Sequence, residues 1–200
     1  MELTDHQLME AVAKGDEGAF RLLMERHQRL VHGTVLRMLG DPFEAEDVAQ
    51  RVFVRVWQAA PRYRPEAKFN TWLLTIVRHL VFNESRRLSR LRTVETKLFQ
   101  PREGEEEPSE PDLFDPRQRD PASLLAGKEF RGKLDRAIAA LPENQRMAIL
   151  LKAHEDLPYE EIAAILETSL GATKSLLFRA REALKASLGE AAGDLFDGAF

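Results

Sequence analysis

Apolar residues recur three and four positions apart over most of the chain, which is the spacing of one face of an α-helix. No stretch alternates apolar and polar residues as a half-buried strand would, so the sequence predicts an all-α protein. Turn residues and prolines divide the pattern into separate segments. We expect helices over about residues 4–15, 16–40, 41–59, 70–92, 130–141, 143–155, 158–167 and 169–185.

Capping signals mark several of these helix starts. Thr4, followed three residues later by Gln7, predicts a capping box. Pro158, which has no N–H to leave unpaired, is expected at the first position of its helix. Side chains that can cap the N-termini of other helices occur at Asp16, Asp41, Asn70 and Ser169.

The helical pattern fails over residues 97–122, where prolines recur among many acidic residues. Such a segment buries too little apolar surface to offset the chain entropy lost on ordering, so we predict a flexible linker. It would join a domain at residues 1–96 to a second helical domain at residues 123–189, followed by a tail at 190–200. We expect two separate cores, with the arginines after Trp72 exposed; one continuous core that buried those arginines would argue against this division.

Residues 157–185 predict two helices around a polar turn, the layout of a helix-turn-helix. Lys174 and Ser175, near the start of the second helix, would reach base edges in a DNA major groove. Arg179 and Arg181 would meet phosphates. An ordinary amphipathic hairpin with a solvated basic face is the alternative. The face of the second helix that should pack inward carries Thr173, Leu177, Ala180 and Leu184.

Aromatic and basic residues are interleaved between Arg62 and Arg92. Bases of an opened DNA strand stack on aromatic rings, and arginines nearby hold the phosphates. The alternative is that Trp72 and Phe82 are core residues and the arginines a solvated helix end. The candidate strand-binding residues are Arg62, Tyr63, Arg64, Lys68, Phe69, Asn70, Thr71, Trp72, Arg78, His79, Asn83, Arg86 and Arg87.

The third predicted helix has an outer face that could receive a helix of a partner protein. A charged stripe of this kind can equally be a normal solvated surface. The residues of this face are Asp47, Gln50, Arg51, Phe53, Val54 and Trp57.

Composition narrows the class of protein. Apolar residues make up 44% of the chain and charged residues 31%, as in ordinary folded domains. The chain has no cysteine, which excludes disulfides and thiolate metal sites. We find neither an apolar run that could span a bilayer nor a signal peptide, so we expect a cytoplasmic protein. The net charge of −4 is uneven, with basic residues at 78–97 and 174–185, which suits local contact with DNA and a larger partner.

No catalytic constellation is evident. The five histidines are scattered without the spacing of a helical metal site, and there is no glycine-rich phosphate loop. His27 lies on an apolar helix face and is expected in the core. We therefore predict no catalytic residue, no metal and no cofactor, and regard a helical enzyme as the weakest hypothesis.

Three segments in order resemble a bacterial RNA polymerase sigma factor of the sigma-70 family, in its extracytoplasmic-function (ECF) group. They are DPFEAEDVAQRVFVRVWQ, FNTWLLTIVRHLVFNESRR, and LPENQRMAILLKAHEDLPYEEIAAIL with the helix KSLLFRAREAL. The resemblance covers nearly the whole chain except the linker and tail. It implies a transcription initiation factor that binds core RNA polymerase, at the beta-prime clamp helices and the beta subunit, and directs it to promoters.

The resemblance also implies a role for each domain. The first would be region two, with its third helix docked on the clamp helices of the polymerase beta-prime subunit. The loop at 61–68 and the fourth helix would hold the −10 element as an opened strand, with one base flipped out. The linker would thread toward the polymerase active site. Region four, in the second domain, would read the −35 element as duplex through Thr173, Lys174, Ser175, Phe178, Arg179 and Arg181.

Several residues depart from the pattern that the family usually shows. Arg51 stands where an acid is common, and His79 where asparagine is common. Ala172-Thr173 replaces a commoner Thr-Val pair, and Leu176 replaces a common arginine. An anti-sigma partner is also implied. The competing hypothesis is a helix-turn-helix regulator that binds an operator as a dimer, although no heptad seam marks a dimer and the aromatic, basic first domain would be unexplained.

Overall fold

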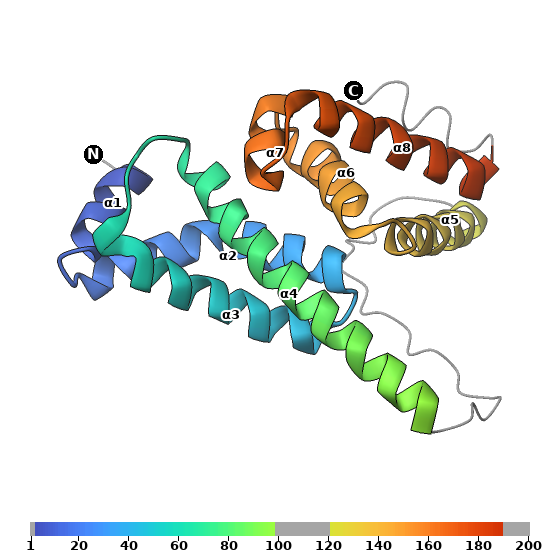
Figure 1. The fold of residues 1–200 in the computed structure, drawn as a ribbon, viewed down its shortest axis with the longest axis horizontal. Coiled ribbons are helices and arrows are strands. Elements are labelled where there is room, and N and C mark those ends of the chain that lie inside the picture. The colour runs from blue at the N-terminus through green and yellow to red at the C-terminus, as the bar shows by residue number, and fades with distance from the viewer. Residues whose placement is uncertain (1–2, 99–120, 190–200) are drawn as a thin grey trace.

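The computed structural model in Figure 1 describes residues 3–98 and 121–189, and every element in those ranges is a helix. The side chains described are those of residues 3–91 and 130–189. Most of the predicted linker and the whole predicted tail lie outside the described residues. The first group of helices is α1 (Asp5–Val12), α2 (Glu17–Leu39), α3 (Pro42–Ala59), the 3-10 turn η1 (Ala60–Arg62) and α4 (Phe69–Leu98). The second group is α5 (Pro121–Ala139), α6 (Glu143–Glu155), α7 (Tyr159–Leu166) and α8 (Leu170–Leu188).

Local side-chain caps fix most helix starts as the sequence predicts. Thr4 and Gln7 form the capping box, and the Asp16 carboxylate accepts a hydrogen bond from the Ala19 N–H at 3.0 Å. The Ser169 hydroxyl accepts one from the Ala172 N–H at 3.2 Å. Each bond satisfies a backbone donor that the first turn of a helix leaves unpaired.

Two predicted helix starts are wrong, that of α4 by two residues and that of α7 by one. The Lys68 carbonyl accepts the Trp72 N–H at 3.2 Å, so α4 begins at Phe69 and Asn70 lies inside the first turn. Pro158 has an extended backbone, with ψ of 152°, and therefore precedes α7 as its N-cap residue. Asn70 is therefore not the cap that we predicted, and Pro158 stands one residue before its predicted position.

The cores follow the apolar spacing. In the first group, Val48, Val52 and Val56 of α3 are buried, as are Leu73 and Val77 of α4. Packing of α3 against both α2 and α4 closes this core. In the second group, the buried face of α8 is the predicted one, made of Thr173, Leu177, Ala180 and Leu184, and it packs against α6 and α7.

The two helix groups touch, which corrects the expectation of separate cores. In Figure 1, α7 lies beside the N-terminal half of α4, and α2 and α6 are also in contact. Arg146 of α6 donates to the Met38 carbonyl of α2 at 2.7 Å. Buried apolar residues of both groups form one continuous network. Arg78 is only 8% exposed, whereas Arg86 and Arg87 are exposed as expected.

Candidate nucleic-acid and polymerase interfaces

The aromatic residues at the start of α4 are anchored rather than free. The Tyr63 ring packs edge-on against Trp72 with centroids 4.8 Å apart, and its hydroxyl lies 2.5 Å from Nδ1 of His6. Burial, with a smaller effect from the Asp5 charge, raises the pKa of Tyr63. Trp72 is half-buried and Phe69 is 5% exposed. Phe69 is therefore a core residue and not the free stacking platform we predicted, because α2 and the loop cover it; His27 of α2 packs on its ring at 4.8 Å.

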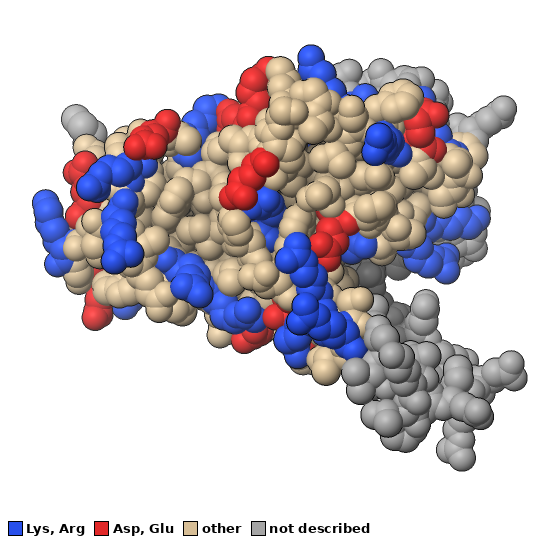
Figure 2. All heavy atoms as spheres, viewed as in Figure 1, with Lys and Arg blue, Asp and Glu red and all other residues tan. Residues whose placement is uncertain are grey.

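The other predicted strand-binding residues are either exposed or bonded to the second helix group. Arg62, Arg64 and Asn70 are exposed at the N-terminal end of α4, and Asn83, Arg86 and Arg87 are exposed farther along it. In Figure 2, Lys and Arg side chains gather over this C-terminal part of α4. The remaining polar residues, Lys68, Thr71, Arg78 and His79, bond to the second helix group instead.

Two carboxylates and one carbonyl at α7 engage these four side chains, and we name this the α4–α7 contact. Glu161 accepts from the Lys68 ammonium at 2.5 Å and from the Thr71 hydroxyl at 2.8 Å. Glu167 pairs with Arg78 at 2.6 Å and with His79 at 2.9 Å. The Leu166 carbonyl accepts a further bond from Arg78 at 2.9 Å. The bond from Lys68 to Glu161 and the bond from Arg78 to Glu167 hold the pKa of each carboxyl below its ordinary value.

This contact also explains why the exposure predicted for Arg78 is wrong. A buried guanidinium is tolerated when hydrogen bonds and an opposite charge replace its water. Leu166 and Glu167 supply both from 88 and 89 residues away in sequence, a distance over which no local pattern could reveal them.

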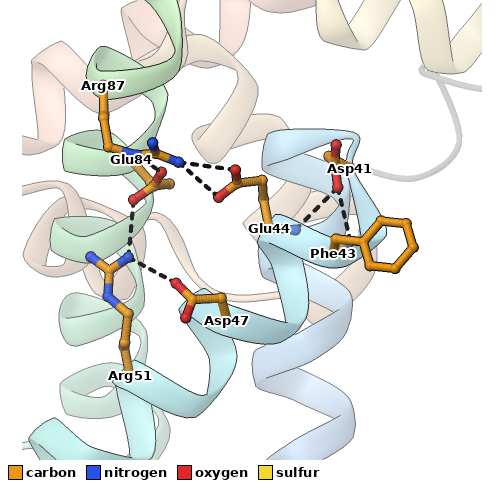
Figure 3. A network of polar contacts seen from close by, with 7 residues as sticks. All are labelled: Asp41, Phe43, Glu44, Asp47, Arg51, Glu84 and Arg87. Atoms are coloured by element: carbon orange, nitrogen blue, oxygen red, sulfur yellow. Dashed lines mark hydrogen bonds and ion pairs between the residues drawn. The ribbon is translucent and has the colours of Figure 1, made fainter. Parts of the chain in front are cut away.

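A second polar network, shown in Figure 3, joins α3 to α4 through Glu84. The Glu84 side chain is 3% exposed and accepts from Arg51 at 3.0 Å and also from Arg87. Arg51 further donates to Asp47 at 3.1 Å, and Arg87 to Glu44 at 2.9 Å. Burial disfavours the charged carboxylate, but the two arginine bonds outweigh it and the pKa of Glu84 is lowered. Arg51 thus has an intramolecular partner. Sequence reasoning missed Glu84, although its spacing of three from Arg87 was a signal.

The outer face of α3 borders a groove against α2, with a volume of about 760 Å³. We call it the α2–α3 groove. Its apolar lining comes from Phe20, Met24, Ala49, Phe53, Val54 and Trp57. Its polar lining comes from Gln28, Arg29, His32, Glu46 and Gln50. Val54 is 53% exposed and Trp57 is half-buried, whereas Phe53 is 6% exposed. Asp47 and Arg51, also predicted for this face, do not line the groove and bond to each other instead.

The predicted helix-turn-helix presents an exposed face on α8. Lys174, Ser175 and Arg179 are exposed, and Phe178 is 62% exposed. Thr173 is fully buried and lies on the inner face of α8, as predicted, so its side chain is not on the exposed face with the other predicted DNA-contact residues. Its hydroxyl lies 3.3 Å from that of Thr168 in the turn. Arg181 is half-buried and donates to the Tyr159 hydroxyl at 3.1 Å, which ties α8 to α7.

No helix within the described ranges is both long enough and apolar enough to cross a membrane. Two family models match the chain, and their spans fall on the two helix groups. The model described as Sigma-70 region 2 matches residues 23–91, and that described as Sigma-70, region 4 matches residues 131–184. The ECF RNA polymerase sigma-E factor of Escherichia coli (strain K12) is 35% identical over 189 residues, covering 92% of this chain and 93% of the relative. This chain belongs to the ECF group of the sigma-70 family.

Further comparisons agree with this assignment. The RNA polymerase sigma-H factor of Pseudomonas aeruginosa is 33% identical over the same shares of the two chains. The solved structure of CnrH in complex with the cytosolic domain of CnrY is similar with a TM-score of 0.62, at 25% identity, covering 92% of this chain and 96% of CnrH. The sigma factor RpoE of Bartonella quintana, solved with the anti-sigma factor NepR, shares the fold with a TM-score of 0.62 at 20% identity, covering 86% of this chain and 97% of RpoE.

Membership in this family decides among the hypotheses raised from the sequence. The protein is a transcription initiation factor that confers promoter specificity, and it is not an enzyme. The dimeric operator-binding regulator is not favoured.

Proposed function

We propose that the α2–α3 groove of this sigma factor docks the clamp helices of the beta-prime subunit of core RNA polymerase. The groove is the observation that carries the proposal. Its exposed apolar residues fit the apolar side of a partner helix, and polar lining residues such as Gln50 can set the register of docking.

Promoter contact would be divided between the two domains. Lys174, Ser175, Phe178 and Arg179 on the exposed face of α8 support reading of the −35 element as duplex. The loop at 61–68 and α4 would hold the −10 element as an opened strand. The phosphates of that strand would be contacted by Arg62, Arg64, Arg86 and Arg87. Melting is then driven by binding the opened strand more tightly than the duplex.

A matched pair of substitutions tests the docking surface. Val54→Asp places a charge in the α2–α3 groove, and we expect affinity for purified core polymerase to fall by roughly tenfold or more, as at an interface centre. Leu22→Asp is the control, because Leu22 is 49% exposed on α2 but does not line the groove. Equal affinities of the two variants and the wild type, measured by fluorescence anisotropy with core enzyme, would reject this docking site.

We also propose that the protein acts in the cytoplasm, where polymerase and chromosome are found, and that an anti-sigma protein binds it. The similarity to CnrH, which was solved with the cytosolic domain of CnrY, supports the second point. A tagged copy isolated from cells should bring down core polymerase and an inhibitor that core polymerase displaces. Isolation of core polymerase alone under every growth condition would count against the inhibitor.

A further inference from the structure

Tyr63 anchors the loop that the proposed function assigns to the opened promoter strand. The structure describes every residue of 61–68, and seven of them are exposed, whereas Tyr63 is half-buried. Its ring packs edge-on against Trp72 with centroids 4.8 Å apart and against Phe69 with centroids 6.2 Å apart. Within the first helix group, the position of the loop therefore depends mainly on what holds the Tyr63 side chain.

Helix α1 carries the polar partner of Tyr63. Nδ1 of His6 lies 2.5 Å from the Tyr63 hydroxyl oxygen, and the two rings stack with centroids 5.8 Å apart and planes at 22°. Helix α1 is itself fixed on α2, because Met9 is fully buried and the Asp5 carboxylate pairs with Arg26 at 2.5 Å. His6 therefore reaches the loop from a helix whose own position is fixed.

A cleft of about 360 Å³ lies between α1 and the first half of the loop. Its walls include Lys14 of α1 and Arg64 of the loop. Between residues 5–14 and 60–68, all of which are described, the one hydrogen bond is that of His6 with Tyr63. The cleft leaves the loop room to move, so this bond sets the distance between the two walls.

We propose that His6 is a positioning residue for −10 recognition: by bonding to Tyr63, it makes α1 hold the loop at 61–68 in the conformation that receives the opened strand. The inference rests on the proposed role of that loop in strand binding. His6 acts through Tyr63 and does not contact the DNA. The family model for region 2 begins to match at residue 23, beyond the end of α1, so the match assigns no role to this helix.

The size of the effect follows from the loss of one hydrogen bond. The net contribution of a bond between two side chains changes a local opening equilibrium by about three- to tenfold. Loops with few buried contacts open at a small cost in free energy, so losing one bond lowers the fraction of chains whose loop is in place. Because the apparent affinity falls in proportion to that fraction, we expect strand binding to weaken by about two- to fivefold.

Four variants separate the bond from the rings. His6→Phe and Tyr63→Phe each remove the bond and keep an aromatic ring, and the double variant has no further bond to lose. If the bond carries the effect, each single variant and the double variant should show the same loss. His6→Asn is the conservative variant, because the amide of asparagine places a hydrogen-bonding atom at the position of Nδ1 and should restore wild-type behaviour.

Hydrogen exchange measures the position of the loop in the full chain without polymerase. The Tyr63 N–H donates to the Ala60 carbonyl at 3.2 Å, and its exchange reports on opening of the loop. We expect this exchange to be about three- to tenfold faster in His6→Phe, in Tyr63→Phe and in the double variant, and unchanged in His6→Asn.

Fluorescence anisotropy measures strand binding by the holoenzyme formed with purified core polymerase. The probe is a fluorescein-labelled strand that the wild-type holoenzyme selects from short single-stranded DNA of random sequence and that core polymerase alone does not retain. We expect the variants with faster loop exchange to bind this probe more weakly, and His6→Asn to bind it as the wild type does.

Every other result contradicts the inference at a different step. Unchanged exchange in His6→Phe means that the bond does not hold the loop. Losses that add up in the double variant, or a His6→Asn variant as impaired as His6→Phe, mean that the rings act without the bond. Faster exchange with unchanged strand affinity means that binding does not depend on loop position, while the proposed function survives. If no selected strand requires the sigma factor, the proposed −10 role falls together with the inference.

Discussion

Glu84 should be the residue of the first domain whose charge matters most for stability. Its carboxylate is 3% exposed and bridges α3 to α4 through Arg51 and Arg87 (Figure 3). Glu84→Gln keeps the shape but removes the anion that Arg51 and Arg87 share, so that Arg51 keeps only Asp47 and Arg87 only Glu44. Hydrogen bonds to a charged group stabilise a fold by about 1.5–3 kcal/mol, but Arg51 and Arg87 are about half exposed and water screens their charges. We therefore expect a loss of about 1–2 kcal/mol of unfolding free energy.

The assay can observe this domain alone. Both tryptophans of the chain, Trp57 and Trp72, lie in the first helix group, so urea unfolding followed by tryptophan fluorescence reports on that group. The control is Glu66→Gln, which neutralises an exposed carboxylate in the loop before α4 and should change stability by less than about 0.5 kcal/mol.

Acid titration adds a second check with a defined sign. The pKa of Glu84 is lowered in the folded protein, so its charge stabilises the fold above the carboxyl's ordinary pKa of about 4.3. That contribution is lost as pH falls through the lowered value. The stability difference between wild type and Glu84→Gln should therefore be full near pH 7 and should shrink below about pH 4.3. Two results would contradict a stabilising role for the Glu84 charge. One is a Glu84→Gln variant as stable as Glu66→Gln at pH 7, and the other is a stability difference between wild type and Glu84→Gln that does not depend on pH.

Three further predictions concern a cap, a core position and the recognition face. Asp41→Ala removes the cap bonds to the Phe43 and Glu44 N–H groups at 2.8 and 3.1 Å and should cost about 1 kcal/mol, seen in the same tryptophan-monitored unfolding. Leu177→Ala, at a residue 1% exposed, should destabilise the second domain by about 2–5 kcal/mol and lower its thermal midpoint in circular dichroism. Phe178→Ala, at a neighbour 62% exposed, should leave that midpoint unchanged but weaken binding of the polymerase holoenzyme to promoter duplex; an unchanged affinity would contradict its role in −35 reading.

Features that arise from interactions within a few residues along the chain could be predicted from the sequence. Apolar residues spaced by three and four sort into inner and outer faces, which is why the buried face of α8 could be predicted and why Thr173 belongs to it. Caps such as Thr4 and Asp41 act on backbone groups two or three residues away, so their sequence signals were sufficient. The three motifs in order were enough to indicate the family.

The burial of a side chain that the sequence predicts to be exposed depends on the packing of helices that are distant in sequence. Arg78 and Arg86 are both arginines of α4 that the sequence predicts to be exposed. Arg78 is nevertheless buried, because Glu167 and the Leu166 carbonyl at α7 bond to it. Glu84 became the centre of a network because Arg51 reaches it from 33 residues away. Partners so distant in sequence leave no periodic signal, since their approach depends on how whole helices dock rather than on the turn of any one of them.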